Sequence, residues 1–163
     1  MRLIELLKIS MYDKKDMVKF VNSYCKEYKN RQGLASALFK VEDKSFYEIK
    51  RALYKALSKT KVILEPMEVG TRGYFIETKN LIALNLESFN AATIVHEMTH
   101  AVQHELGYNF DNYISYSVEK DNYKDYRYQL VEYEAFMMGN TWASNSYRLE
   151  KFIRKQIKKG LAI

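Results

Sequence analysis

The sequence AATIVHEMTHAVQHEL, residues 91–106, decides how this chain folds. Its apolar residues recur at helical spacing and predict one helix whose apolar side faces the core. His96 and His100 are four residues apart, so their imidazoles share one face of that helix. Glu97 follows the first histidine and turns partly toward the same side, so three polar groups are brought together.

Two neutral imidazoles at this spacing can bind one zinc ion, and a third protein ligand leaves one coordination position open for water. A carboxylate beside that water can take its proton, because the metal lowers the pKa of the water. We therefore expect one Zn2+, with His96 and His100 as ligands and Glu97 as the general base. The alternative is a surface helix with incidental histidines, which is disfavoured because a chain of this length seldom contains the motif by chance.

The third ligand has to come from elsewhere in the chain. His104 continues the row, but a rise of about 1.5 Å per residue places it roughly 12 Å along the axis from His96. We expect His104 on the wall of the cleft or at the helix end. The chain has three histidines, so a carboxylate is the expected third ligand and the single cysteine, Cys25, is the second choice.

Residues 129–139 have helical character and contain two candidate carboxylates, Glu132 and Glu134. Residues two apart on a helix point about 200° from each other, so only one can face the ion. Three and seven residues after Glu132 are Ala135 and Gly139, whose small size allows the close approach that a short glutamate requires. The pattern favours Glu132, with Glu134 as the alternative metal ligand, or else as a group that faces solvent or orients a ligand.

The elements before residue 91 predict an α+β fold. Helices are expected at residues 2–11, 13–28 and 45–59, and strands at 61–65, 73–78 and 81–86. Gly33 should lie just beyond the second helix, Ser45 and Glu48 form a capping box, and Asn80 tolerates the positive φ of a tight turn. We expect a small antiparallel sheet packed on the metal-binding helix, which starts at Ser88 or Asn90, with additional N- and C-terminal helices.

A tyrosine-rich stretch follows the metal-binding helix, and no helical or strand period fits residues 108–128. A long irregular segment beside a metal site is often a lid or binding loop. The alternative is that these rings only cover the rim. A tyrosine hydroxyl could stabilise the oxyanion of a tetrahedral intermediate, and Tyr123, Tyr126 and Tyr128 are the candidates.

Length and charge favour a single domain at residues 1–163, with a helical part (1–60), a sheet and metal-site core (61–140) and a basic C-terminal helix (141–163). The core holds 6 Lys and Arg against 12 Asp and Glu, and the last part holds 6 against 1. Basic flanks could attract nucleic acid, but solvated outer faces are favoured, so we expect no specific binding.

The C-terminal helix carries an apolar stripe that includes Leu149, Ile153 and Ile157. We expect this stripe to dock on the domain, in preference to a membrane surface or RNA. No apolar run is long enough to span a membrane, the N-terminus does not read as a secretory signal, and a lone cysteine forms no internal disulfide. These features predict a cytoplasmic protein.

Residues 93–103 (TIVHEMTHAVQ) followed by 126–135 (YRYQLVEYEA) resemble a gluzincin-type zinc metallopeptidase. They are most similar to the small bacterial and phage minigluzincins and the ImmA/IrrE-like group, and the resemblance covers residues 72–140. It implies a zincin-like fold, and it again selects Glu132, because the group places its ligand glutamate three residues before a small residue. It also implies that the 73–86 hairpin offers an edge along which a peptide adds. Leu130 departs from the proline that the group often has there.

The sequence therefore predicts a zinc-dependent endopeptidase that acts on an intracellular protein. The main alternative is a catalytically weak binding module on a zincin fold, with a protein or nucleic-acid partner. A further alternative is a metalloenzyme that cuts a non-protein amide. The presence of Glu97 favours an enzyme, because a binding module has no physical need for a general base.

Overall fold

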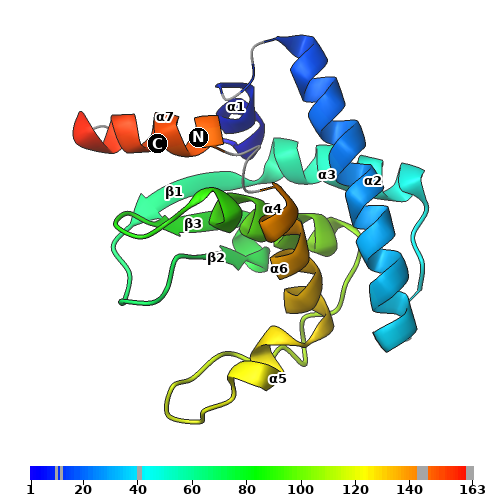
Figure 1. Ribbon diagram of the computed structural model, residues 1–163. Coiled ribbons are helices and arrows are strands. Elements are labelled where there is room, and N and C mark those ends of the chain that lie inside the picture. The colour runs from blue at the N-terminus through cyan, green and yellow to red at the C-terminus, as the bar shows by residue number, and fades with distance from the viewer. Residues whose placement is uncertain (10, 12, 40–41, 143–146, 161–163) are drawn as a thin grey trace.

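The computed structural model describes residues 1–9, 11, 13–39, 42–142 and 147–160, and it combines helices with one three-stranded sheet. The α+β class is therefore confirmed. Helices α4 (Ala91–Glu105) and α6 (Leu130–Trp142) lie side by side near the centre (Figure 1). The other elements are α1 (Leu3–Ile9), α2 (Lys14–Phe39), α3 (Phe46–Lys59), β1 (Lys61–Glu65), β2 (Gly73–Ile76), the 3-10 turn η1 (Glu77–Lys79), β3 (Leu81–Asn85), α5 (Tyr123–Arg127) and α7 (Tyr147–Lys158).

The sheet is mixed, so the expectation of an antiparallel sheet is wrong for one of its two strand pairs. The strand order is β1-β3-β2, in which β2 is antiparallel to β3 and β1 is parallel to it. The strand with the most buried residues, β3, takes the central position, where both of its edges are paired. The chain reverses direction between β1 and β2 and again between β2 and β3, so β3, which lies between them, runs parallel to β1.

The connection between β2 and β3 is longer than expected, because it covers residues 77–80 and not only 79–80. Strand β2 ends at Ile76, and the 3-10 turn takes up Glu77 and Thr78, which were expected to continue the strand. Asn80 has a φ of 45°, which confirms the predicted left-handed turn residue.

The two edges of the sheet differ. On the outer side of β1, the Val62 N–H donates to the Met1 carbonyl at 2.8 Å, and the Leu3 N–H donates to the Thr60 carbonyl at 2.8 Å. On the outer side of β2, no backbone hydrogen bond is made with any residue that the structure describes. The sheet therefore has one covered edge and one open edge, and the open edge is β2.

Helices α3 and α4 start at caps that were expected, although only the Ser45 half of the predicted Ser45–Glu48 capping box is seen. The Ser45 hydroxyl accepts the Glu48 N–H at 3.1 Å at the start of α3. Asn90, one of the two candidates, caps α4: its side chain accepts the Thr93 N–H at 2.9 Å, and the Thr93 hydroxyl accepts the Asn90 N–H at 3.3 Å. These bonds satisfy backbone donors that a helix N-terminus leaves unpaired.

Helix α4 is buried on nearly every side, including the face that carries its histidines. The sequence predicted one apolar and one polar side, and α6 and β2 cover the polar one. Polar groups on this face must therefore find partners inside the protein.

Helix α2 continues to Phe39, so the helix end expected near Tyr28 is wrong. Tyr24, Tyr28 and Gln32 are fully buried and four residues apart, and α2 packs on α3 and α6. This packing outweighs the low helix propensity of Gly33, which costs about 1 kcal/mol relative to alanine.

Helix α7 docks on the domain, as predicted. Ile153 is fully buried, and Phe152 and Ile157 pack against the core; the side chain of Leu149 lies outside the described part. Glu150 accepts the Ala91 N–H at 2.7 Å, and Arg154 donates to the Phe89 carbonyl at 2.7 Å. Among the described helices, none combines the length and apolar content needed to cross a membrane.

Candidate metal centre

Three side chains from α4 and α6 converge in the interior. Nε2 of His96 lies 3.0 Å from Oε2 of Glu132, and Nε2 of His100 lies 2.9 Å from Oε1 of the same carboxylate. One potential ligand atom from each of the three residues lies within 4.8 Å of the other two. The structure thus brings together the three residues that the sequence selected as ligands.

Small residues on α6 make this approach possible. A Cβ atom at Gly139 would lie 2.8 Å from the Ala92 carbonyl oxygen and 3.3 Å from the His96 Cβ atom, so any larger residue would separate the helices. Ala135, one turn closer to Glu132, is fully buried. The close helix contact that was expected on the Glu132 face is therefore confirmed.

The His100 ring is oriented by a neighbour on its own helix. The Gln103 side-chain oxygen lies 2.9 Å from His100 Nδ1, and because an amide oxygen only accepts, Nδ1 carries the hydrogen. The lone pair of Nε2 then faces the Glu132 carboxylate, and two lone pairs at this distance require a proton or a metal ion between them. Burial lowers the pKa of His100, but the hydrogen bond and charge of Glu132 outweigh it and raise that pKa to about 9.

Glu132 has the character of a metal ligand. Burial raises its pKa, but the contacts and charges of His100 and His96 outweigh burial and hold it well below the usual range, so the carboxylate is ionised. Its Oε1 accepts a hydrogen bond of 2.7 Å from the Tyr113 hydroxyl. Its Oε2 is buried and has no hydrogen-bond partner among the described residues. A metal ion shared with His96 would satisfy this oxygen, so the residues fit a bound cation.

Glu97 lies between the paired histidines and strand β2. Burial raises its pKa above the usual range, although His96 and His100 act in the opposite direction. A Cβ atom at Gly73 of β2 would lie 2.9 Å from the Ala83 carbonyl oxygen and 3.1 Å from Thr93 Cγ2, so the glycine lets β2 approach the start of α4, and Glu97 Cγ would lie in ordinary contact at 3.4 Å. No described residue donates a hydrogen bond to the Glu97 carboxylate, which leaves it able to accept a proton.

The three candidate tyrosines have different positions. Tyr123 and Tyr128 are 49% and 58% exposed. Tyr126 is more buried, and its pKa is raised by burial first and then by the negative charges of Glu132 and Glu97. Of the three, Tyr126 is the one whose pKa is raised by the charges of both Glu132 and Glu97.

The remaining candidates lie outside the ligand group. Glu134 is buried, and its carboxylate accepts hydrogen bonds from Tyr28, Gln103 and Tyr108. Of the two alternatives given for Glu134 if it is not a ligand, exposure to solvent is therefore excluded, and contact with a neighbour of a candidate ligand remains. Cys25 lies in the hydrophobic core. His104 lies 3.8 Å from a carboxylate oxygen of Glu77, near the start of the turn after β2.

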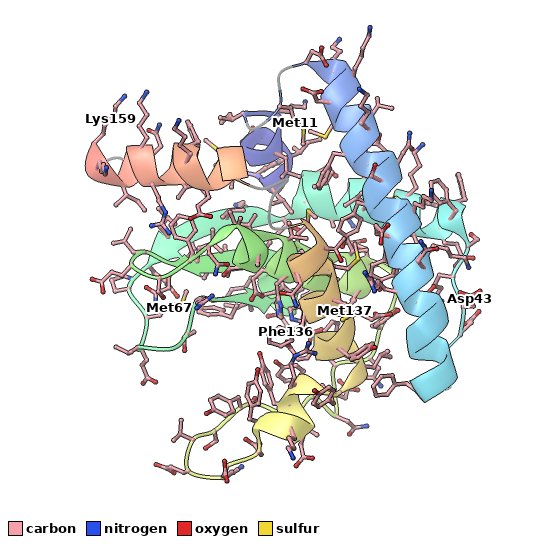
Figure 2. The ribbon with its side chains drawn as sticks, viewed as in Figure 1. Met11, Asp43, Met67, Phe136, Met137 and Lys159 are labelled. Atoms are coloured by element: carbon pink, nitrogen blue, oxygen red, sulfur yellow. The ribbon has the colours of Figure 1, made fainter. Side chains whose placement is uncertain are left out.

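Sequence reasoning missed Gln103, Tyr113 and Phe136. Gln103 is three residues after His100, a spacing that places both on one helix face and could have been noticed. Tyr113 belongs to the irregular tyrosine-rich stretch, where no period indicates which ring turns inward. Figure 2 shows Phe136 on α6, and its ring centroid lies 4.5 Å from that of His96.

Arg127 at the end of α5 completes the surroundings of the site. Its guanidinium carbon lies 4.2 Å from the centroid of the Phe136 ring, a cation–π contact that connects α5 to α6.

No protein-family model, curated protein or solved structure matches this chain. The interpretation of the site therefore rests on its own geometry and chemistry.

Proposed function

We propose that this protein is a zinc-dependent endopeptidase that hydrolyses peptide bonds of an intracellular protein substrate. The observation that carries the proposal is the convergence of His96, His100 and Glu132 beside the carboxylate of Glu97. Two imidazoles and one carboxylate are typical of catalytic zinc sites, in which a fourth position stays open. A zinc ion held there would lower the pKa of a bound water molecule and polarise a carbonyl group.

Glu97 is the general base of this proposal. Its raised pKa moves it closer to neutral, which suits a group that accepts a proton from water and then passes it to the leaving amine. Its burial also keeps the proton from exchanging freely with bulk solvent. The second step restores the carboxylate for the next turnover.

Tyr126 is the proposed hydrogen-bond donor to the developing oxyanion. Its hydroxyl is protonated at neutral pH, as in any tyrosine, and burial beside Glu132 and Glu97 raises its pKa further. It can therefore donate to an oxygen atom that gains charge in the transition state. Tyr123 and Tyr128 are less suited, because their rings are more exposed.

The open edge of β2 is the proposed path of the substrate. An extended peptide can add to an unpaired strand edge through backbone hydrogen bonds. Gly73 brings β2 against Thr93 and Glu97 of α4, so a peptide on this edge would pass beside the general base. The covered β1 edge offers no such path.

Zinc content and cleavage test the proposal together. After reconstitution, wild type should hold about one equivalent of zinc by elemental analysis, and His96→Ala should hold almost none. The zinc-loaded protein should cut members of a diverse peptide library, and a chelator should stop the cleavage.

Each other outcome has its own meaning. Near-zero zinc in both proteins would exclude the metal site. Bound zinc without cleavage of any peptide or protein would favour the binding module for a protein or nucleic-acid partner. Cleavage restricted to small non-peptide amides would change the substrate class.

A further inference from the structure

A buried chain of hydrogen bonds leads from His100 away from the candidate metal centre. The Gln103 side-chain oxygen lies 2.9 Å from His100 Nδ1. The Gln103 side-chain nitrogen donates to the Val131 carbonyl at 2.9 Å and to the Glu134 carboxylate at 3.1 Å. Gln103 is fully buried and Glu134 nearly so, which separates both side chains from bulk solvent.

The Val131 carbonyl fixes the orientation of the Gln103 amide. A backbone carbonyl oxygen only accepts, so the amide nitrogen must face α6 and the amide oxygen must face His100. His100 therefore carries a hydrogen on Nδ1, and in the neutral ring Nε2 has the lone pair. This is the tautomer in which Nε2 can bind a metal ion.

Glu134 holds the far end of the chain. Its carboxylate accepts the Gln103 amide, the Tyr28 hydroxyl at 3.0 Å and the Tyr108 hydroxyl at 3.1 Å. These donors belong to α4, α2 and the segment after α4, so the carboxylate joins three parts of the fold. Glu132 and Glu134 are two residues apart on α6, and they direct one carboxylate to the histidines and the other to this chain.

We propose that Gln103 and Glu134 are positioning residues, which hold His100 in the orientation and tautomer that bind a metal ion through Nε2. The inference rests on the proposed function only in taking His100 as a metal ligand. The ordinary alternative is that these groups stabilise the fold and have no bearing on the metal. The two roles predict different effects on zinc affinity when another buried amide of the same network is removed.

Gln103→Met removes the amide and keeps an apolar side chain of similar length. Zinc affinity, measured by competition with a chelator, should fall roughly 10- to 100-fold, as is usual when a partner of a metal-binding histidine is lost. Glu134→Met should also weaken zinc binding. Glu134→Gln should largely restore it, because a glutamine oxygen can still accept the Gln103 amide.

Gln32→Met is the matched control. Gln32 is equally buried, donates to the Tyr108 hydroxyl at 2.9 Å and accepts the Lys44 N–H at 2.8 Å, and among the described residues it makes no hydrogen bond with His100. It should lower the free energy of unfolding and leave zinc affinity unchanged. If Gln32→Met weakens zinc binding as much as Gln103→Met, the role is structural and the proposal is wrong.

Nitrogen-15 NMR of the His100 ring supplies a readout that a structural role would not move. In zinc-loaded wild type, Nδ1 should carry a slowly exchanging hydrogen and Nε2 should show the shift of a metal ligand, and Gln103→Met should lose the protected hydrogen. Coordination through Nδ1 in wild type would overturn the proposal.

In metal-free wild type, Nδ1 should again carry the protected hydrogen, because the Gln103 oxygen can only accept. A ring without a hydrogen on Nδ1 would also overturn the proposal. Failure of wild type to bind zinc would instead contradict the proposed function, while this measurement still tests the orientation.

Discussion

Glu97 and Glu132 are both buried carboxylates, yet their surroundings shift their pKa values in opposite directions. For Glu97, burial prevails and raises the pKa. For Glu132, the contacts with His100 and His96 prevail over burial and lower it. Neighbouring carboxylates with separated pKa values are typical of sites where one group moves a proton and the other remains charged.

Glu97→Gln tests this division at the level of one residue. The variant should keep its zinc, because the ligand set is untouched, and lose cleavage by at least roughly 100-fold, because the amide cannot accept a proton. The measurement is kcat/KM on an identified peptide, together with zinc content. Glu77→Gln, near the turn after β2, is the control and should keep its activity. Unchanged turnover in Glu97→Gln would mean that another group activates the water.

The metal-free protein should lose stability as pH rises from 6.5 to 9. The pKa of His100 in the folded state is about 9, above its ordinary value of 6.5. A raised histidine pKa stabilises the fold fully below the ordinary value and ceases to do so as pH passes the folded value. Urea denaturation in the presence of a chelator at several pH values measures this.

Glu132→Gln is the control for that pH dependence, because it removes the charge that raises the pKa of His100. Its stability should change much less over the same pH interval. An equal slope in both proteins would assign the effect to other groups.

Some residues of the candidate site could be predicted from their neighbours in the sequence, and others could not. His96, Glu97 and His100 follow from spacing within one helix, and Glu132 follows from the small residues that come after it. Tyr113 could not be predicted, because its partner lies on α6 and its own segment has no period. The contacts that select it form only when the chain has folded.

At the level of elements, the contact between α4 and α6 determines the geometry of the site. Gly139→Ala should lower the free energy of unfolding by about 1–3 kcal/mol, because its Cβ atom would meet the Ala92 carbonyl and force the helices apart. Zinc affinity should fall with it, since Glu132 moves with α6. Chemical denaturation and zinc titration measure the two effects.

Gly33→Ala in α2 is the control for this substitution. A Cβ atom there would meet nothing within 4 Å, so the variant should gain roughly 0.5–1 kcal/mol from helix propensity. A Gly139→Ala protein that is as stable as wild type and binds zinc equally would show that α4 and α6 can accommodate a Cβ atom at this position.

The pairing of the strands and the length of α2 were harder to predict than which segments form helices and strands. The strands and the helices around them follow from periodicity, but the parallel pairing of β1 with β3 does not, because it depends on which strand takes the centre of the sheet. The length of α2 was also missed. Its continuation beyond Tyr28 depends on packing against α3 and α6, which local propensity does not contain.

For the whole molecule, the basic surface of α7 is the feature that could recruit nucleic acid. Lys151, Lys155 and Lys158 are exposed there, while Ile153 is buried in the domain. We expect only weak binding that falls steeply with salt, as counterion release dictates. Fluorescence anisotropy with a labelled oligonucleotide at low and moderate salt measures it. Tight, saturable binding that persists in salt would favour the binding-module alternative.

The attachment of α7 to the start of α4 also bears on how the protein is made. The ribosome synthesises α4 and α6 before α7, so both histidines and Glu132 are present before Glu150 can accept the Ala91 N–H. A nascent chain that ends before Glu150 has the first turn of α4 held by the Asn90 cap and by packing on α6 and β2, while the Ala91 N–H lacks this partner. The last helix therefore adds its hydrogen bond to the start of α4 only after the residues of the candidate site have been made.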